Sequence, residues 1–322
     1  MRILRTLQRL APSLRGAAVA VGNFDGVHRG HRAVLEAARQ AARRLGAPLG
    51  VLTFEPHPRQ LFRPQDPPFR LTQFRGKAMR LREEGVDLCY VANFTRTFSR
   101  LSAHAFVEDV LVGALGARHV AVGEDFVFGQ GRTGNAILLR DAAQRRGFGL
   151  TLVAPAGAGT TTVFKSSAIR VLLTEGRPRD AAEVLGAWWR VTGRVRHGDA
   201  RGRTLGYPTA NLALGPLVRS RFGIYAVWAT VDGQPPRAAV ANLGIRPMFG
   251  AEQPLLEVHL FDFDGDLYGR HLCVDVVEYL RPEAKFADVP ALIRQMDADS
   301  AQARALLAKP ENAPDRFHRA TA

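Results

Sequence analysis

The chain has 322 residues, enough for two domains that each bury a core of their own. Its 46% hydrophobic and 23% charged residues are ordinary for a soluble globular protein. The formal charge of +14 suggests nucleic acid, but the arginines are scattered along the chain and no block of five or six like charges occurs. We therefore interpret the charge as a solvated, arginine-rich surface and expect no nucleic-acid partner.

The two cysteines, Cys89 and Cys273, lie far apart in the sequence, and neither belongs to a C-x-x-C pair. Lone thiols suit a reducing compartment, so we expect a cytoplasmic protein without a cysteine metal site. No run of about 18 apolar residues occurs, so we expect no membrane span. The basic N-terminus superficially resembles a transit peptide, but it leads directly into an apolar strand, and we treat it as mature protein.

In chain order, the first strong signal is a short apolar run at residues 17–21, which predicts a buried parallel strand. Glycines and an asparagine then break the run, and helical spacing begins at Arg32. A strand, a glycine-bearing turn and a helix start can hold a phosphate, because backbone N–H groups and the helix dipole point at the anion. His28 and His31 share a helix face there and can donate to phosphate oxygens. From the spacing alone, half a metal site or two surface histidines remain alternatives.

The string GNFDGVHRGH at residues 22–31 resembles the signature of the flavin-adenylylating module of bacterial bifunctional riboflavin kinase/FAD synthetases. This family has a nucleotidyltransferase Rossmann-like fold in that module. The resemblance implies that His28 and His31 stabilise a departing pyrophosphate. It also implies ATP or FMN contacts from five further residues of the string, namely Gly22, Asn23, Phe24, Asp25 and Gly30.

The rest of the first half alternates strands and helices. We predict strands at residues 48–54, 86–91 and 119–122, helices at 77–84 and 94–116, and a long flap at 59–75. Because the candidate ligands follow strand ends, this order predicts a doubly wound parallel sheet for about residues 1–180.

Two further strings of the first half resemble the same family. FEPHP places Phe54, His57 and Pro58 at the end of the second strand, where a proline-rich turn with an incidental histidine is the alternative. The segment GEDFVFG resembles a family box, which implies that Asp125 and Phe126 border the adenylyl-transfer pocket. A surface loop is the alternative for that segment.

A third string, FKSSAIR at residues 164–170, is expected to begin a helix. Ser166 and Ser167 are suitable capping residues, and Arg170 would then lie on the first turn. The equivalent family string supplies triphosphate contacts, and the planar fork of arginine suits phosphate oxygens. The resemblance therefore implies that Arg170 acts with His28 and His31 to stabilise the departing pyrophosphate. Here Lys165 stands where the family usually has its first serine.

Beyond a predicted linker helix at residues 176–190, the pattern changes to short alternating segments typical of an all-β unit. We predict strands at residues 189–195, 223–231, 237–243, 255–261 and 271–280, followed by a helix at 289–307. Trp188 and Trp189 are expected in core or interdomain packing. The predicted domains are residues 1–180 and 186–308, and a frayed tail is expected at 309–322.

The segment GRVRHGDARGRTLGYPTANL, residues 193–212, joins a glycine- and arginine-rich loop to the string PTAN. The loop can wrap a polyphosphate, which gives four candidate contacts to ATP or flavin, namely Gly193, Gly198, Arg201 and Gly202. Thr209 and Asn211 offer neutral oxygens that suit Mg²⁺. PTAN resembles the riboflavin kinase family, which implies a small closed β-barrel, and no P-loop motif occurs.

In LEVHLFDFDGDLYG, residues 256–269, alternation places Glu257 and His259 on one strand face. Alternation alone favours an exposed charged position on an edge strand. The resemblance implies that Glu257 accepts the proton of an attacking ribityl hydroxyl. Two more strings, VANLGIRPMFG and LRPE, are also similar to the family and imply contacts from Asn242 and Arg281, although Met248 replaces the usual threonine.

Both motif sets occur in the order expected for this family, from about residue 19 to 305. The resemblance implies phosphorylation of riboflavin to FMN and adenylylation of FMN to FAD, with ATP and Mg²⁺ and without a covalent enzyme intermediate. Two alternatives stay open. One is a kinase whose N-terminal half has lost its activity, which Lys165 would favour. The other is a flavin- or nucleotide-binding regulator that touches RNA.

Overall fold

The computed structural model describes residues 1–322 except 9, 156–163, 198–204, 249–250 and 318–322, and describes 246–248 and 251–253 by their backbone alone. The chain forms two compact units. The first comprises Met1–Asp66 and Lys77–Phe164, and the second comprises Pro67–Gly76 and Lys165–Ala322. Segment 67–76 therefore belongs to the second unit although it lies within the first half of the sequence.

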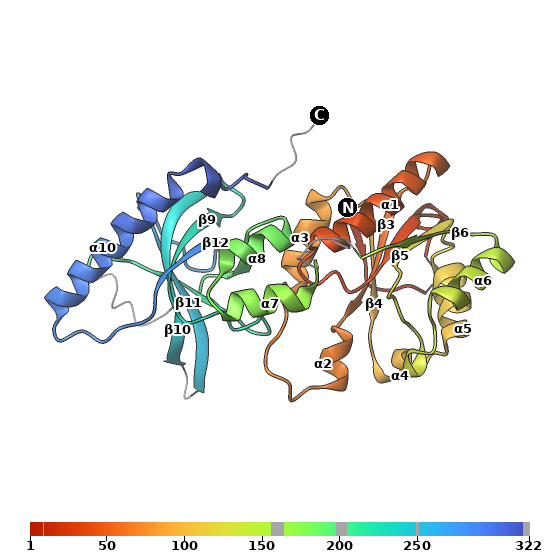
Figure 1. Cartoon of the computed structure of the whole chain (residues 1–322), viewed down its shortest axis with the longest axis horizontal. Helices are drawn as coiled ribbons and strands as arrows, with labels where there is room; N and C mark the ends of the chain where they lie inside the picture. Colours follow the sequence, from red (N-terminus) through yellow and green to blue (C-terminus); the bar gives the residue numbers. More distant parts are fainter. Residues whose placement is uncertain (9, 156–163, 198–204, 249–250, 318–322) are drawn as a thin grey trace. The chain divides into compact units, whose positions relative to one another are not determined.

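The first unit contains a six-stranded parallel sheet in the order β1-β4-β3-β2-β5-β6 (Figure 1). The strands are β1 (Arg2–Leu4), β2 (Ala18–Val21), β3 (Leu49–Glu55), β4 (Leu88–Asn93), β5 (His119–Gly123) and β6 (Gly149–Val153). The chain runs from β2 outward to β3 and β4, then returns to place β5 on the other side of β2. The strand order reverses beside β2, so its carboxyl end lies where open α/β sheets bind ligands.

Helices and turns connect these strands. Their bounds are η1 (Pro12–Leu14), α1 (Arg29–Leu45), α2 (Pro58–Phe62), α3 (Phe74–Glu83), α4 (Arg96–Ser99), α5 (Ala103–Ala105), η2 (Phe106–Ala114), η3 (Gln130–Arg132) and α6 (Ala136–Arg146). Helix α1 packs on β2, β3, β5 and β6 through a stripe of buried residues that includes Leu35 and Ala38. The left-handed Gly46 ends this helix.

The parallel sheet and the four strands predicted in this unit are confirmed, with ends shifted by one or two residues. The single helix predicted at residues 94–116 is wrong. Thr95 and Ser102 each accept a hydrogen bond from a backbone N–H three residues on, so two separate N-caps divide the segment into α4 and α5, and a π-helix, η2, continues from α5. The predicted flap at 59–75 instead begins inside a helix, because Pro58 starts α2 under a capping box between His57 and Gln60.

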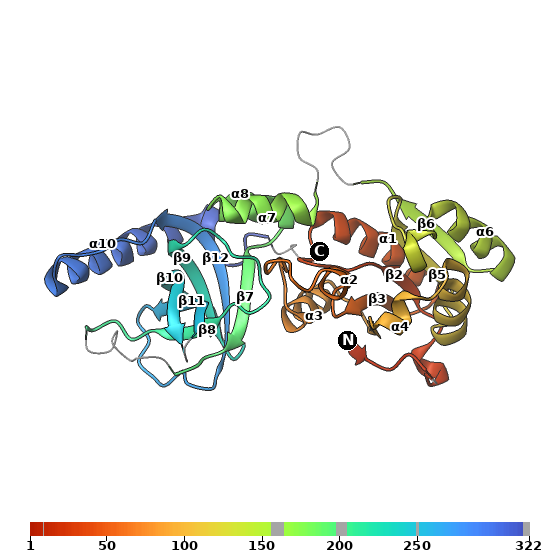
Figure 2. The ribbon, with the colours of Figure 1, turned by 90° about the horizontal axis from the view of Figure 1, so that it is seen from below.

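The second unit is a nearly closed antiparallel barrel with strand order β7-β12-β9-β10-β11-β8, visible in Figure 2. Its strands are β7 (Trp189–Arg194), β8 (Ala210–Ala213), β9 (Gly223–Val231), β10 (Arg237–Met248), β11 (Ala251–Leu260) and β12 (His271–Arg281). The two end strands approach each other beyond β7, where the Arg196 N–H donates to the Asn211 carbonyl at 3.0 Å. The predicted small barrel is confirmed.

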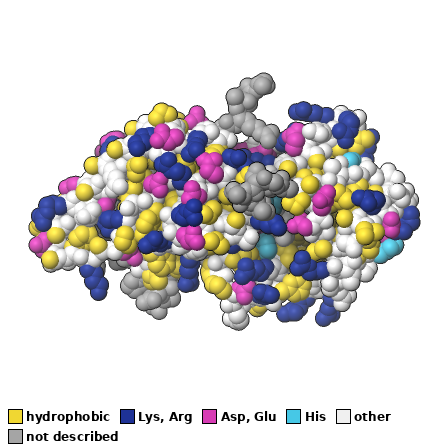
Figure 3. Space-filling model, viewed as in Figure 1, with side chains coloured by type: hydrophobic (Ala, Val, Ile, Leu, Met, Phe, Trp, Pro, Cys, Tyr) yellow, Lys and Arg dark blue, Asp and Glu magenta, His cyan; other side chains and the backbone are white. Residues whose placement is uncertain are grey.

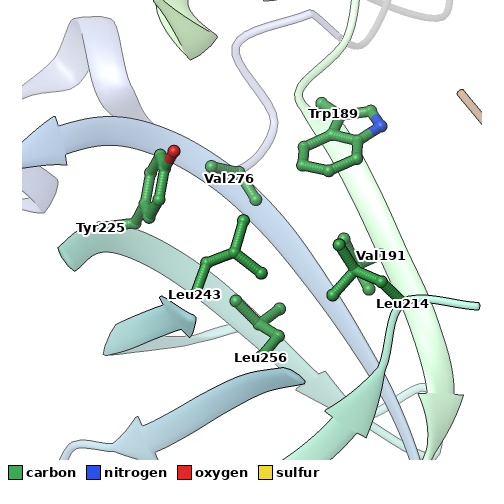
Figure 4. A pocket seen from close by; sticks show the side chains of 7 residues that line it. All are labelled: Trp189, Val191, Leu214, Tyr225, Leu243, Leu256 and Val276. Atoms are coloured by element: carbon green, nitrogen blue, oxygen red, sulfur yellow. The ribbon is translucent and has the colours of Figure 1, made fainter. Parts of the chain in front are cut away.

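Apolar side chains fill the barrel interior (Figure 4). They surround a void of only about 10 Å³, which is close to the lower limit for one water molecule. The residues that line this void are Trp189, Val191, Leu214, Tyr225, Leu243, Leu256 and Val276. The Tyr225 hydroxyl is satisfied by the Arg221 carbonyl and by Ser220. A ligand of this unit must therefore bind outside the barrel core.

Helices α7 (Ser166–Thr174), α8 (Pro178–Leu185), α10 (Val289–Leu307) and η4 (Pro310–Asn312) complete the second unit. Helix α10 packs across β9, β10 and β12 on the outside of the barrel (Figure 2). The predicted linker helix at 176–190 is shorter, because the left-handed Gly186 ends α8. Both Trp188 and Trp189 are buried in packing, as expected.

Two segments outside the strands are also held on the barrel. In segment 67–76, Arg70 exchanges backbone hydrogen bonds with Pro216 and Val218, and the Leu71 carbonyl accepts from the Trp189 indole at 2.9 Å. The tail from residue 309 was expected to be frayed. The structure instead ties Asn312 to the barrel, because its carbonyl accepts a hydrogen bond from the Trp228 indole at 2.7 Å. In the described residues, no helix is long and apolar enough to cross a membrane.

Candidate functional site

The turn between β2 and α1 has an unusual backbone. Phe24 and Val27 have positive φ angles of 48°, and Gly26 lies between them at 89°. Side chains with a Cβ rarely adopt this conformation, least of all β-branched valine. Burial holds it in place, since Phe24, Asp25 and Val27 are each at most 2% exposed. The strain therefore lies at the carboxyl end of β2, directly before the helix N-terminus.

His28 and His31 form a compact pair at the start of α1. His28 is the N-cap, and its Nδ1 accepts from the His31 backbone N–H at 3.4 Å. The two rings stack with centroids 3.7 Å apart. Gly30 leaves room for this arrangement, because a Cβ there would lie 2.9 Å from the Phe164 carbonyl oxygen and 3.2 Å from the His28 ring. The glycine of H-x-G-H is therefore needed for steric reasons, because a side chain at this position would collide with its neighbours.

The environment of His31 favours its neutral form. Burial, then His28, then Lys77 hold the pKa of His31 well below its ordinary value of 6.5. Its Nδ1 is buried and has no hydrogen-bond partner among the described residues. An incoming phosphate would supply both a partner and a compensating negative charge. Binding of an anion would therefore give His31 a hydrogen-bond partner and favour its protonated form.

Sequence reasoning missed Lys77, which is fully buried behind this turn. Its Nζ lies 2.8 Å from Glu55 Oε1 and 3.2 Å from Thr53 Oγ1. Thr53 Oγ1 donates in turn to the Asn23 carbonyl at 3.1 Å. The available signal was the spacing of Lys77 with buried Leu81, one turn apart on the apolar side of α3.

Phe54 belongs to a chain of aromatic contacts. Its ring lies 5.8 Å from Phe94 and 6.4 Å from Phe106. Phe106 contacts Phe128 at 5.3 Å, and Phe128 stacks on Phe126 at 5.5 Å. The predicted site residues Phe54 and Phe126 therefore belong to one aromatic cluster, which we define as Phe54, Phe94, Phe98, Phe106, Phe126 and Phe128.

Other predicted residues of the first half have visible structural tasks. His57 Nδ1 accepts from the Arg59 N–H at 3.1 Å and caps α2, which begins at Pro58. Asp125 is exposed just after β5. Gly22 and Asn23 continue directly from β2 into the strained turn.

The helix predicted at FKSSAIR is present as α7, in the second unit. The expected serine cap is wrong, because the N-cap is Lys165 and its side chain makes no capping hydrogen bond. Ser166 and Ser167 are the first two helical residues. Arg170 lies one turn further on, where its Nε donates to the Phe69 carbonyl at 2.6 Å and its guanidinium packs on the Phe69 ring.

In the barrel, strand register brings three predicted residues into one row. Asn211 of β8 lies opposite Glu257 of β11, and Glu257 lies opposite Asn242 of β10. Directly opposed residues of antiparallel strands share a sheet face. Asn242 Nδ2 lies 3.3 Å from Glu257 Oε2 and 3.4 Å from Glu283 Oε1. One amide group therefore connects two carboxylates, a link that the sequence did not reveal.

A cavity of about 400 Å³ opens beside this row on the outer side of the barrel. Its lining includes Thr209, Asn242, Glu257, His259, Arg281 and Glu283. Glu257 and His259 are partly exposed, whereas Val258 and Leu260 are buried, which confirms the predicted alternation. The cavity thus combines a carboxylate with neutral oxygen and amide groups.

Arg281 forms part of the cavity wall and is also tied to α10. Its Nε and Nη2 donate to the two carboxylate oxygens of Asp299 at 2.8 and 2.6 Å. Asp299 is 4% exposed and accepts a further bond from Gln295. The bidentate ion pair fixes the helix that closes one side of the cavity. Contact of Arg281 with a substrate stays a prediction.

The chemistry of the Thr209–Asn211 segment fits Mg²⁺. Asn211 is 6% exposed, and its Oδ1 is buried without a hydrogen-bond partner among the described residues. Hard cations favour such neutral oxygens together with phosphate oxygens. Among described residues no group of three or more His, Cys, Asp or Glu could hold a metal.

Gly193 lies in β7, and the predicted Gly198, Arg201 and Gly202 fall outside the described residues.

Family comparisons assign both halves of the chain. Residues 10–167 match the FAD synthetase model and residues 185–307 match the riboflavin kinase model. A protein from Escherichia coli (strain K12) is 40% identical over 305 residues, covering 94% of this chain and 97% of its own. One from Pseudomonas fluorescens is 41% identical over 309 residues, covering 96% and 98%. Both are named bifunctional riboflavin kinase/FMN adenylyltransferase. This chain belongs to that family.

A crystal structure of a protein from Streptococcus pneumoniae has the same fold as this riboflavin kinase/FMN adenylyltransferase family member. It aligns with a TM-score of 0.81 and 30% sequence identity over 94% of this chain and 98% of its own. Its title describes a macrolide-efflux protein, a description that neither family model shares. The FAD synthetase match contains the histidine pair, and the riboflavin kinase match contains the Glu257 row.

Proposed function

We propose which residues carry the two activities of this family member. The riboflavin kinase part phosphorylates riboflavin to FMN, and the FAD synthetase part adenylylates FMN to FAD. For the kinase, the observation that carries the assignment is the Asn211–Glu257–Asn242 row beside a cavity of about 400 Å³. For the adenylyltransferase, it is the stacked His28–His31 pair at the N-terminus of α1.

In the kinase site, Glu257 acts as the general base. A ribityl hydroxyl oxygen forms a bond to the γ-phosphorus of ATP as the bridging P–O bond to the β-phosphate breaks, and ADP leaves. The hydroxyl proton passes to the Glu257 carboxylate. Asn242 orients that carboxylate by its hydrogen bond at 3.3 Å. Gly193 and the glycine-rich loop that follows hold the nucleotide phosphates.

Thr209 and Asn211 are the proposed Mg²⁺ ligands of the kinase site. A bound Mg²⁺ would neutralise phosphate charge there. The buried, unpartnered Oδ1 of Asn211 supports this assignment. Thr209 lines the same cavity as Glu257, and Asn211 lies opposite Glu257 in the strand register, which supports a shared site for the proposed cation and the proposed base.

In the adenylyltransferase site, a phosphate oxygen of FMN attacks the α-phosphorus of ATP. The bond from that phosphorus to the bridging oxygen of the β-phosphate breaks, and pyrophosphate leaves. His28, His31 and the N-terminal dipole of α1 offset the charge that develops on the leaving group. The nucleophilic oxygen comes from FMN, so no covalent enzyme intermediate is required. Arg170, Ser166 and Ser167 remain proposed triphosphate contacts.

The experiment separates the two sites within one chain. Wild-type protein is incubated with riboflavin, ATP and Mg²⁺, and with FMN, ATP and Mg²⁺, and the flavins are separated by chromatography. Glu257→Gln should abolish FMN formation and preserve conversion of supplied FMN to FAD. His28→Ala with His31→Ala should do the reverse. If either variant lost both activities while remaining folded, the assignment of two separate sites would be wrong.

Riboflavin, FMN and ATP are the partners we propose, in a cytoplasmic location and without nucleic acid. On the face shown in Figure 3, Lys and Arg side chains are spread among acidic and apolar ones. A dispersed charge of this kind supports small-molecule rather than nucleic-acid binding. Tight RNA binding with a steep salt dependence would contradict this proposal.

A further inference from the structure

We propose that Lys77 is a positioning residue for adenylyl transfer, which holds the β2–α1 turn and places a positive charge behind the histidine pair. The proposal rests on the leaving-group role of His31 proposed above. Lys77 itself is fully buried, so it acts on the substrate through other groups. It therefore differs from a lysine that contacts phosphate directly.

The direction of each hydrogen bond around Lys77 is fixed by chemistry. A lysine ammonium only donates, so Thr53 Oγ1 must accept from Nζ at 3.2 Å. The Thr53 hydroxyl proton then points to the Asn23 carbonyl at 3.1 Å. Asn23 directly precedes Phe24, the first residue with positive φ in the strained turn. Lys77 is thus connected through one side chain to the backbone whose conformation presents His28.

The buried ammonium of Lys77 is paired with a carboxylate. Glu55 Oε1 lies 2.8 Å from Nζ, and the Glu55 side chain is 14% exposed whereas that of Lys77 is 0% exposed. A buried lysine without such partners would lose its proton or destabilise the fold. Titratable groups that interact with this cluster include Cys89 of β4, on which Arg5 also acts, and His31. The histidines lie on the side where the phosphate would bind.

This arrangement has a consequence for His31. The lysine charge favours a neutral imidazole in the free protein, in addition to the effects of burial and of His28. Removing the charge should therefore raise the pKa of His31. A lysine that served packing alone would leave that pKa unchanged when replaced by an apolar side chain of similar length.

The test uses Lys77→Met, which keeps the length of the side chain and removes its charge. Two further variants separate its roles. Thr53→Val breaks the link to Asn23 but retains the charge, and Lys77→Met with Glu55→Gln removes both charges of the ion pair. FAD formation from FMN and ATP is measured alongside FMN formation from riboflavin. The His31 ring is titrated by NMR between about pH 4 and 8.

We expect both Lys77 variants to raise the His31 pKa and to lower kcat for FAD formation about tenfold or more, because the turn is misplaced. Thr53→Val should lower kcat and leave the His31 pKa unchanged. Riboflavin phosphorylation should remain normal in all three. An unchanged His31 pKa and unchanged kcat in the double variant would overturn the proposal, as would an unchanged pKa in a slow, folded Lys77→Met protein.

Separate variants test the role of Lys77 and the role of His31. If His31→Ala forms FAD at the wild-type rate, the leaving-group role of His31 is wrong, and the proposal for Lys77 falls with it. If His31→Ala is inactive and the Lys77 variants behave as wild type, only the role of Lys77 is wrong. Chemical-shift dispersion of the first unit shows whether each variant is folded.

Discussion

At the scale of single residues, the histidine pair depends on Gly30, which leaves room for the His28 ring. In Gly30→Ala the new Cβ would lie 2.9 Å from the Phe164 backbone oxygen and 3.2 Å from the His28 ring, so one of them must move. We expect a loss of stability of about 1–3 kcal/mol and at least a tenfold slower formation of FAD. Both are measured by thermal unfolding and the flavin assay.

Gly76→Ala is the matched control for Gly30→Ala. Its Cβ would meet only Thr192, at an ordinary contact distance of 3.7 Å, and alanine favours the helical conformation of α3. This variant should form FAD normally. Riboflavin phosphorylation should be normal in both proteins. Normal FAD formation by Gly30→Ala would show that the ring stack does not need the observed close approach.

The two thiols should differ sharply in reactivity. Cys89 is fully buried in β4, and burial raises the pKa of its thiol to about 11. Almost none of it is thiolate at pH 8, whereas Cys273 is partly exposed. A chromogenic disulfide reagent should therefore leave Cys89 unmodified in the native protein and label both cysteines after unfolding. Rapid native labelling of Cys89, located by peptide mass, would contradict this expectation.

The sequence predicted some of the site residues well and missed others for a physical reason. His28 and His31 are neighbours along a helix, so their spacing alone predicted a shared face. Lys77 is separated from Thr53 and Glu55 by more than 20 residues, and its burial depends on how α3 packs on the sheet. A single lysine in a helical pattern carries no sign of that packing.

At the scale of elements, α10 is held against the barrel by one buried ion pair. Arg281→Met would leave the 4%-exposed Asp299 carboxylate without its bidentate partner. Breaking such a pair costs about 3–5 kcal/mol. Because α10 contributes Met296 and Ser300 to the cavity wall, the KM for riboflavin should also rise. Urea unfolding and riboflavin kinase kinetics measure the two effects.

Arg177→Gln is the control for the loss of the Arg281 charge. Arg177 pairs with Asp180 at 2.7 Å, but both side chains are about half exposed, so water screens the interaction. We expect no measurable change in the unfolding midpoint or in the KM for riboflavin. If Arg281→Met behaved in the same way, α10 would be held by its apolar packing and not by the ion pair.

Strand positions could be predicted from the sequence, whereas strand partners could not. Alternation placed Glu257 and His259 on one face, and the structure agrees. The contact of Glu257 with Asn242 arises from the register of two consecutive strands, which pairs residues 15 positions apart in the sequence. The failure at residues 94–116 had a different cause, since the apolar pattern hid two capping residues that restart the helix.

At the scale of the whole molecule, both units contain histidines whose pKa the fold lowers. Burial, and then Arg44, lower the pKa of His119 in the first unit. Burial, Arg75 and Arg194 lower that of His271 in the second unit, more than Asp232 raises it. The pKa of His31 is the one most clearly lowered. Acid stability is therefore linked to groups in both halves of the chain.

The direction of this linkage follows from proton counts. Each of these histidines has a native pKa below the 6.5 of an ordinary histidine, so just below pH 6.5 the unfolded chain binds more protons than the native protein. The free energy of unfolding should therefore fall as pH decreases from about 6.5 to 5, by up to about 1.4 kcal/mol per pH unit for a buried histidine that remains neutral in the native state, and by less for His271, where water screens the interactions. Urea unfolding across this range measures the slope.

The variant His119→Gln should make the slope shallower without affecting either activity. Glutamine retains a polar group for the Thr151 hydroxyl, which now lies 2.8 Å from the imidazole. A slope identical to that of the wild type would mean that His119 takes up its proton in the native state as readily as in the unfolded chain.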